Sequence, residues 1–185
     1  MNKKILFIIA VVASAALTAH ANLVTNPGFE TGSFSGWTQF GDTSFTGVGA
    51  GAPYAHSGTF GAYFGPTSAD GGIFQAIPTT IGQTYTVDFW LSNDDSQGNN
   101  HMSASFGGVP LLALVNAPPF PYTHYTTNVT ALSASSLLNF TFYNPPAYYY
   151  LDDVAVNVVP EPGTLGLIAL GALGLVGALR KRLLV

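Results

Sequence analysis

The side chains of this 185-residue sequence with the clearest chemical potential are carboxylates that have no basic partner. Between Asn22 and Val159 the chain contains eight acidic residues and no Lys or Arg. The acids are Glu30, Asp42, Asp70, Asp88, Asp94, Asp95, Asp152 and Asp153. Such carboxylates favour a bound hard cation or hydrogen bonds from backbone N–H groups. The excess negative charge makes nucleic acids and anionic lipid surfaces poor partners, so we expect no nucleic-acid role.

Aromatic and amide side chains form a second chemical set. Sugar recognition uses flat aromatic faces that stack on C–H surfaces, together with polar side chains that bond hydroxyl groups. Trp90 alternates with apolar neighbours and should be exposed, and Asn93 and Asn99 follow it closely. We therefore predict ligand binding by Trp90, Asn93 and Asn99. Trp37 is instead expected in the core, because large aromatic side chains are usually buried.

The sequence shows no catalytic constellation. His56, His101 and His124 lack metal-ligand spacing, and Asp94 and Asp95 are adjacent, which places them poorly for attack on a glycosidic bond from two sides. There is no nucleophile elbow, phosphate loop or dinucleotide fingerprint. The absence of cysteine excludes a thiol nucleophile, disulfides and Cys-ligated zinc. We predict no catalytic residue and no enzyme activity; a glycoside-active enzyme is the weakest alternative.

Residues 92–100 carry acids and amides around a single glycine. They lack the ligand spacing of an EF-hand loop, so metal binding there is not favoured. The segment predicts a hydrophilic hairpin loop that could bond a sugar.

The amino-terminal segment has the layout of a secretory signal peptide. Lys3 and Lys4 precede an apolar run at 5–17, and the small-x-small site Ala19-His20-Ala21 follows it. Because the run is short for a membrane span of about 20 residues, we expect cleavage after this site rather than a permanent anchor helix. Residues 1–21 are predicted to be the signal peptide.

The carboxyl-terminal segment carries a sorting pattern. Pro160, Glu161 and Pro162 precede an uncharged, Leu- and Gly-rich stretch at 164–179, and Arg180, Lys181 and Arg182 follow it. In this order these features resemble the PEP-CTERM sorting signal of Gram-negative bacteria, here residues 159–185. The resemblance implies recognition by an exosortase and removal of the apolar stretch, a transmembrane helix. The basic residues would be the membrane stop on the cytoplasmic side. A permanent single-span anchor is the alternative.

Residues 22–158 predict one all-β domain. Short segments rich in aromatic and β-branched residues are separated by Gly, Pro, Asn, Ser and Thr, and no stretch has capped helical periodicity. We expect strands at 61–64, 73–77, 85–92, 102–106, 122–130, 136–143 and 149–158. Such strands favour a jelly-roll-like antiparallel β-sandwich between the signal peptide helix and the transmembrane helix. Alternation in the last strand places Asp152 on the side of Val154, with Asp153 opposite.

Four short pieces of this domain resemble carbohydrate-binding modules with a galactose-binding-like jelly roll. They are Asn22 to Glu30, Gly36-Trp37, His56 to Tyr63, and Leu151 to Val154. The resemblance implies a structural Ca²⁺ held by Glu30, Asp152 and backbone oxygens near Ser57 and Gly58. Oxygen ligands and excess negative charge suit this ion. In the alternative, both carboxylates cap turns through backbone N–H groups.

The sequence therefore predicts an exported, non-enzymatic surface or extracellular-matrix protein that is sorted by an exosortase and associated with exopolysaccharide and biofilm. We expect it first in the inner membrane with its domain in the periplasm, and after processing at the cell surface or outside the cell. Its expected partners are the exosortase, the inner membrane and a polysaccharide. The alternative is a specific carbohydrate-binding protein.

Overall fold

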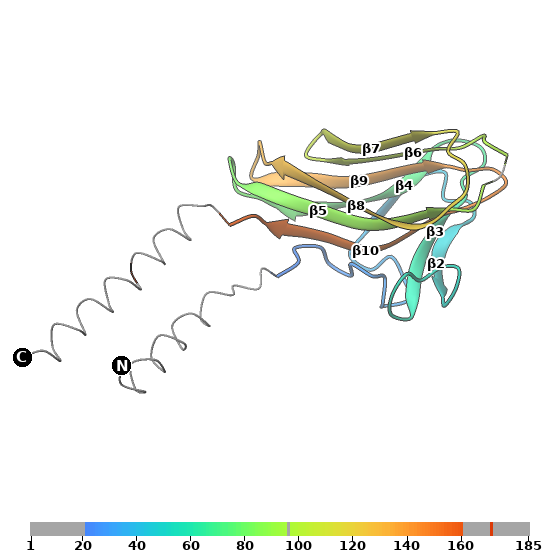
Figure 1. Cartoon of the computed structure of the whole chain (residues 1–185), viewed down its shortest axis with the longest axis horizontal. Helices are drawn as coiled ribbons and strands as arrows, with labels where there is room; N and C mark the ends of the chain where they lie inside the picture. The colour runs from blue at the N-terminus through green and yellow to red at the C-terminus, as the bar shows by residue number, and fades with distance from the viewer. Residues whose placement is uncertain (1–20, 96, 161–170, 172–185) are drawn as a thin grey trace, which may run out of the picture. The chain divides into compact units, whose positions relative to one another are not determined.

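A computed structural model describes residues 21–95, 97–160 and 171. Asn22–Val158 forms one compact unit of ten strands in two five-stranded antiparallel sheets, which lie face to face (Figure 1). No helix occurs within this unit where it is described. The predicted all-β antiparallel sandwich is confirmed.

The order of strands in each sheet differs from their order in the sequence, as in a jelly roll. The first sheet contains β1 (Thr38–Gly41), β4 (Gly71–Pro78), β9 (Ser135–Tyr143), β6 (His101–Phe106) and β7 (Val109–Val115), in that spatial order. The second contains β2 (Thr46–Ala50), β3 (Phe60–Phe64), β10 (Tyr149–Val158), β5 (Thr84–Asn93) and β8 (Phe120–Thr130).

The core lies between the sheets and is built by strand alternation. In β5, Val87, Phe89 and Leu91 are buried, and Phe89 meets Phe140 of the opposite sheet edge-on at 5.2 Å between ring centroids. Trp37 is 7% exposed and belongs to the same core, which confirms its predicted place. Because this unit contains its own core and sheet pairing, it can fold without the segments on either side.

All seven expected strands are present, most of them one or two residues longer than expected. Three strands were not expected: β1, β2 and β7. The first two are short edge strands, TQFG and TGVGA, with a single large apolar residue each, and β7 (VPLLALV) is uniformly apolar with a proline, so it shows no alternation.

The amino-terminal residues of the unit are bonded to its last strand. The Asn22 side chain donates from Nδ2 to the Val154 carbonyl at 2.9 Å and accepts at Oδ1 from the Val156 N–H at 3.0 Å. The Leu23 N–H donates to the Val156 carbonyl at 3.0 Å. The segment that enters the domain therefore lies against β10, the strand that leaves it.

Within the described part of the chain, no helix is long and apolar enough to cross a membrane. The predicted signal peptide, apart from Ala21, lies outside the described residues. So do Glu161, Pro162, the basic cluster at 180–182 and the predicted transmembrane helix, apart from Gly171.

Candidate functional site

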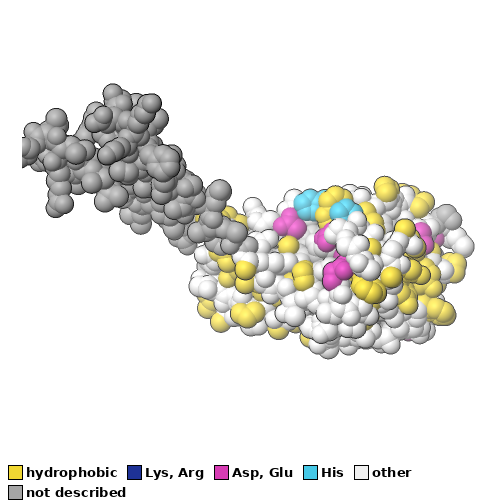
Figure 2. Space-filling view, turned by 90° about the horizontal axis from the view of Figure 1, so that it is seen from below, with side chains coloured by type: hydrophobic (Ala, Val, Ile, Leu, Met, Phe, Trp, Pro, Cys, Tyr) yellow, Lys and Arg dark blue, Asp and Glu magenta, His cyan; other side chains and the backbone are white. Residues whose placement is uncertain are grey.

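Aromatic rings cover the outer face of the sheet that contains β10. We call this surface the aromatic face; its rings are Tyr54, His56, Tyr63, Trp90, Tyr122, His124, Tyr148 and Tyr150. Strands β3, β10, β5 and β8 supply five of them, because outward positions alternate with core positions along each strand. The loop between β2 and β3 supplies Tyr54 and His56, and the connection between β9 and β10 supplies Tyr148. In Figure 2, histidine and acidic side chains gather on one surface of the domain, where no basic side chain is coloured among the described residues.

Four tyrosines of the aromatic face contact one another in a closed cycle. The centroid distances are 5.2 Å for Tyr54–Tyr63, 5.7 Å for Tyr63–Tyr148, 6.2 Å for Tyr148–Tyr150 and 5.9 Å for Tyr150–Tyr54.

Three glycines make room for these rings. A Cβ atom on Gly65 would lie 2.7 Å from the Tyr148 ring. A Cβ on Gly47 would collide with Tyr63, and one on Gly49 with Tyr54. The glycine content of β2 therefore allows the tyrosine rings to lie close against the backbone.

Trp90 lies on the outer face, but other rings stack on it. The His56 imidazole is 3.8 Å away at an interplanar angle of 14°, and that of His124 is 5.1 Å away at 23°. Each imidazole also contacts a carboxylate, His56 Nδ1 with Asp153 at 2.7 Å and His124 Nε2 with Asp88 at 3.2 Å. Trp90 thus supports a ring stack and leaves less open ring surface for a sugar than the sequence suggested.

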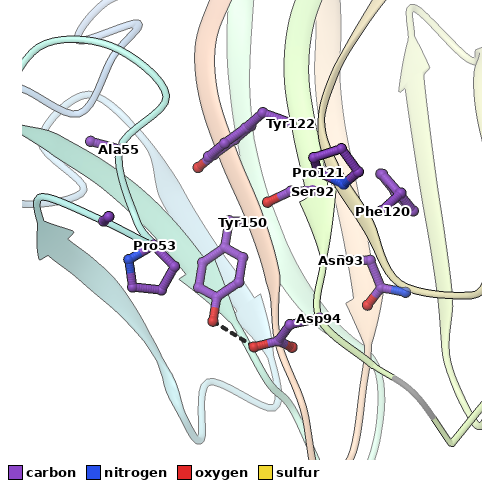
Figure 3. Close-up of a pocket in the computed structure, with 10 residues that line it drawn as sticks. Pro53, Ala55, Ser92, Asn93, Asp94, Phe120, Pro121, Tyr122 and Tyr150 are labelled. Atoms are coloured by element: carbon purple, nitrogen blue, oxygen red, sulfur yellow. Dashed lines mark hydrogen bonds between the residues drawn. The ribbon is translucent and has the colours of Figure 1, made fainter.

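A pocket of about 330 Å³ opens beside the aromatic face. It is lined by Ala52, Pro53, Ala55, Ser92, Asn93, Asp94, Phe120, Pro121, Tyr122 and Tyr150. Figure 3 shows that Tyr122, Tyr150 and Pro53 line the same pocket, and that the Tyr150 hydroxyl points toward Asp94. The lining is therefore mainly aromatic and apolar, with Asp94 as its one charged residue.

Hydrogen bonds fix the polar groups of this pocket. The Tyr150 hydroxyl donates to Asp94 Oδ2 at 2.7 Å, the Tyr148 N–H donates to Asp94 Oδ1 at 2.6 Å, and the Tyr122 hydroxyl donates to the Tyr54 carbonyl. Burial is the main cause that raises the pKa of both Tyr122 and Tyr150, so both phenols stay neutral.

The predicted ligand residues Asn93 and Asn99 lie in different surroundings. Asn93 lines the pocket, but it is buried, and its Nδ2 donates to the Ala117 carbonyl at 3.1 Å. Its Oδ1 accepts from Asn144 Nδ2 at 3.0 Å and from the Asp95 N–H at 3.1 Å, which leaves the amide occupied. Asn99 is exposed and does not line the pocket.

The expected hydrophilic hairpin at 92–100 is not a hairpin. It connects β5 to β6, which belong to different sheets, and Asp95 and Asn100 are buried within it. Asn100 Nδ2 donates to Asp95 Oδ2 at 2.7 Å, and the Tyr149 hydroxyl donates to Asn100 Oδ1 at 2.5 Å. Burial acts to raise the pKa of Asp95, but hydrogen bonds from Asn100 and backbone N–H groups outweigh it and lower the pKa. These polar groups stabilise a connection rather than a surface site.

Glu30 and Asp152 meet at the turn formed by residues 56–60. The Thr59 N–H donates to Glu30 Oε1 at 3.0 Å, and the N–H groups of His56 and Ser57 donate to Asp152 Oδ2 at 2.8 and 3.1 Å. Burial is the main cause that raises the pKa of Asp152 to about 6. The two carboxylates are brought to one turn, where they accept backbone N–H bonds.

A β-bulge corrects the predicted orientation of the two aspartates in β10. The register with β5 shifts between Asp152 and Ala155, and Asp153 has a positive φ of 49°. Leu151 and Val154 are consequently both in the core, although strict alternation would place them on opposite sides. Asp152 therefore does not share the side of Val154. Asp153 also reaches the 56–60 turn, because its Oδ1 accepts from Ser57 Oγ at 2.8 Å.

The oxygen atoms at this turn match Ca²⁺ in donor type. Asp152 Oδ1 and Asp153 Oδ1 both lie beside Gly28: a Cβ atom added to this glycine would be 3.4 Å from the first oxygen and 3.6 Å from the second. No basic side chain occurs between 22 and 159 to balance the carboxylates. Among the described residues, however, no group of three or more acidic or histidine side chains forms a cation cage. The backbone N–H groups described above already use some of the lone pairs of these carboxylate oxygens.

Sequence reasoning missed Tyr54, Tyr63, Pro53 and Phe120 as site residues. Local signals in the sequence do not distinguish them from other loop and strand aromatics, because cross-strand neighbours bring them together. Alternation along β8 could have indicated that Tyr122 and His124 share a face. Phe120 could not be placed in this way, because the pairing of β8 with β5 shifts register between Phe120 and Thr123.

Comparison with known sequences identifies residues 158–182 as a PEP-CTERM protein-sorting motif. The chain therefore carries the predicted sorting signal, which marks an exported protein. The matched segment begins at the last residue of β10. No curated protein sequence matches the chain.

Comparison with solved structures finds the same fold in carbohydrate-binding modules. TmCBM61, solved with β-1,4-galactotriose, has a TM-score of 0.60 and 20% identity over 75% of this chain and 99% of that chain. The CBM22-1 xylan-binding domain from Paenibacillus barcinonensis Xyn10C has a TM-score of 0.54 and 14% identity over 79% of this chain and 99% of that chain. The tailspike protein 4 enzymatically active domain of bacteriophage CBA120 scores 0.59 at 15% identity over 75% of this chain and 21% of that chain. The predicted module-like β-sandwich is confirmed; these likenesses show the fold alone.

Proposed function

We propose that this exported protein binds a polysaccharide through its aromatic face and the adjoining pocket. The observation that carries the proposal is the continuity of the rings: His56 lies 3.8 Å from Trp90 and 5.2 Å from Tyr122, which lines the pocket with Tyr150. The ring faces of this surface that are not covered by a neighbouring ring offer the flat apolar surfaces on which sugar C–H groups pack.

The fixed geometry of the site also supports binding. The tyrosine rings rest on glycine backbone, and the Tyr122 and Tyr150 hydroxyls are each held by a hydrogen bond. A ligand therefore meets a preorganised surface and loses less free energy to the ordering of side chains. The modules that share the fold include one solved with β-1,4-galactotriose and one named a xylan-binding domain.

We propose a non-enzymatic role in the matrix or at the cell surface, after exosortase processing at the motif that begins at residue 158. The burial of Asp95 in the β5–β6 connection supports this non-enzymatic role, because it separates Asp95 from the exposed Asp94, the other acid considered for hydrolysis. Glycan hydrolysis that is lost in Asp94→Asn or Asp95→Asn would instead support the enzyme alternative. Association with exopolysaccharide or biofilm follows from the same proposal.

We also propose a structural Ca²⁺ at the 56–60 turn, held by Glu30, Asp152 and backbone oxygens near Ser57 and Gly58. Three carboxylates of this turn region, those of Glu30, Asp152 and Asp153, have no Lys or Arg between 22 and 159 to balance them. The ion would supply that charge and tie the turn to β10.

The glycan proposal is tested with the purified domain 22–158 on an oligosaccharide array that includes β-1,4-galactotriose and xylan fragments. Tyr122→Ala should weaken binding of the captured glycan at least about tenfold, or roughly 1.4 kcal/mol. Tyr143→Ala is the matched control, because Tyr143 is a half-buried tyrosine of β9 in the other sheet. Failure of the folded domain to bind any glycan, or equal losses in both variants, would contradict the proposal.

A further inference from the structure

The pocket beside the aromatic face contains one charge, and no Lys or Arg of the described domain 22–158 provides a counter-ion for it. Asp94 is exposed, and it is the only acidic or basic residue in the lining. The three histidines of the domain contact other carboxylates: His56 with Asp153, His101 with Asp70 and His124 with Asp88. With no Lys or Arg between 22 and 159, nothing in the domain neutralises Asp94.

Hydrogen bonds hold the Asp94 carboxylate in place. Its two oxygens accept from the Tyr148 N–H at 2.6 Å and from the Tyr150 hydroxyl at 2.7 Å, and its own N–H donates to the Tyr148 carbonyl at 3.2 Å. Each carboxylate oxygen has a further lone pair, so both can still accept from a ligand. The group is therefore an oriented acceptor beside the pocket rather than a flexible surface acid.

The neighbouring pocket wall favours a cation with an apolar body. Tyr122 and Tyr150 present neutral aromatic rings, and Pro53 and Phe120 add apolar surface. Ring faces attract ammonium groups, and a hydrogen bond between an ammonium and a carboxylate is stronger than one between neutral groups. The negative charge of Asp94 also repels sugars that carry carboxylate or sulfate groups.

We propose that the pocket binds a basic amino sugar, one whose amine is protonated and carries no acyl group, within the polysaccharide bound by the aromatic face. The ammonium bonds Asp94 while the C–H surface of the sugar ring packs on Tyr122, which is partly exposed, whereas Tyr150 is only 5% exposed. This inference rests on the proposed function, because it specifies the sugar at the same site. A lysine side chain has the same cation, but a long row of aromatic rings fits a sugar chain better than an extended peptide.

The test compares two oligomers of equal length that differ only at nitrogen. Binding of β-1,4-linked glucosamine tetramer and of its fully N-acetylated form to the domain 22–158 is measured by calorimetry at low salt and at a mildly acidic pH, at which the glucosamine amines are protonated. We expect the amine form to bind about tenfold more tightly, and we expect added salt to reduce this difference. In Asp94→Asn, whose side chain can still accept one of the two hydrogen bonds, the preference should disappear. Asp88→Asn is the matched control, since Asp88 lies on the same sheet, contacts His124 and is outside the pocket.

Three results would overturn the inference. Binding of the acetylated tetramer with no gain for the amine form rejects the amino sugar while the glycan-binding proposal stands. Equal binding of trilysine and the glucosamine tetramer would show that the pocket recognises any amine rather than a sugar. If the folded domain binds neither tetramer nor any glycan on the array, the proposed function and this inference fail together.

Discussion

The His56 imidazole lies almost parallel to the Trp90 ring, 3.8 Å away, while the backbone N–H of His56 donates to the Asp152 carboxylate at 2.8 Å. One residue thereby connects the turn held by the carboxylates to the aromatic face. A change at the turn should consequently alter both the stability of the domain and the placement of rings on the aromatic face.

Asp152→Ala should destabilise the domain by about 2 to 4 kcal/mol, because it leaves the N–H groups of His56, Ser57 and Asp153 without their acceptor. Urea unfolding measures the loss. Asp88→Ala is the control; its carboxylate contacts an exposed imidazole, so the loss should stay below about 1 kcal/mol. Equal losses in the two variants would contradict the role given to Asp152.

Gly49→Ala should weaken glycan binding about tenfold, or roughly 1.4 kcal/mol, because the added methyl group must displace the Tyr54 ring. Affinity electrophoresis in a gel that contains the captured polysaccharide measures the change. Ala50→Ser, at the exposed end of the same strand, should bind normally. Wild-type affinity in Gly49→Ala would show that the packing of Tyr54 on β2 is irrelevant to the ligand.

Chelation should lower the melting temperature of the 22–158 domain, and added Ca²⁺ should restore it, because an ion bound only by the folded state stabilises that state. Glu30→Gln should make the melting temperature insensitive to chelator. If metal-free protein melts at the same temperature with and without Ca²⁺, the backbone N–H bonds alone hold the turn and the calcium proposal is wrong.

Acid should destabilise the domain partly through Asp42. Hydrogen bonds from Ser44, followed by those from Ser68, lower the pKa of Asp42 far below its ordinary value of 3.8. A depressed pKa in the folded state contributes stability above that ordinary value, and the contribution is lost as the pH falls below it. Urea unfolding at a series of pH values should therefore show that the free energy of unfolding falls less steeply at acid pH in Asp42→Asn than in the wild type. Parallel curves would exclude this contribution.

Replacement of Glu161 by Ala should leave the uncut chain in the membrane fraction, if an exosortase reads the motif that begins at residue 158. Immunoblots of membrane and extracellular fractions measure the distribution, and mass spectrometry locates the carboxyl terminus of the released form. A substitution of Thr164, which lies outside the Pro-Glu-Pro tripeptide, is the control. Normal release of the Glu161 variant would contradict sorting through this tripeptide.

The sequence predicted the sandwich because strands such as β5 alternate strictly between core and surface. It also predicted that Glu30 and Asp152, 122 positions apart, would meet, but only through the resemblance to known modules. It did not predict the direction of the aspartates, because one extra residue in the β10 bulge reverses alternation. Nor could it predict the burial of Asn93, since its partners Ala117 and Asn144 come from distant segments.

The position of β10 has a mechanical consequence for a tethered domain. This strand pairs with β3 on one side and β5 on the other, and the sorting motif continues directly from its end. Antiparallel hydrogen bonds run perpendicular to the strands, so a tug along β10 loads many of them in shear at once. A force applied at the carboxyl end of the domain along this strand would therefore be opposed by many hydrogen bonds that must break together rather than one after another.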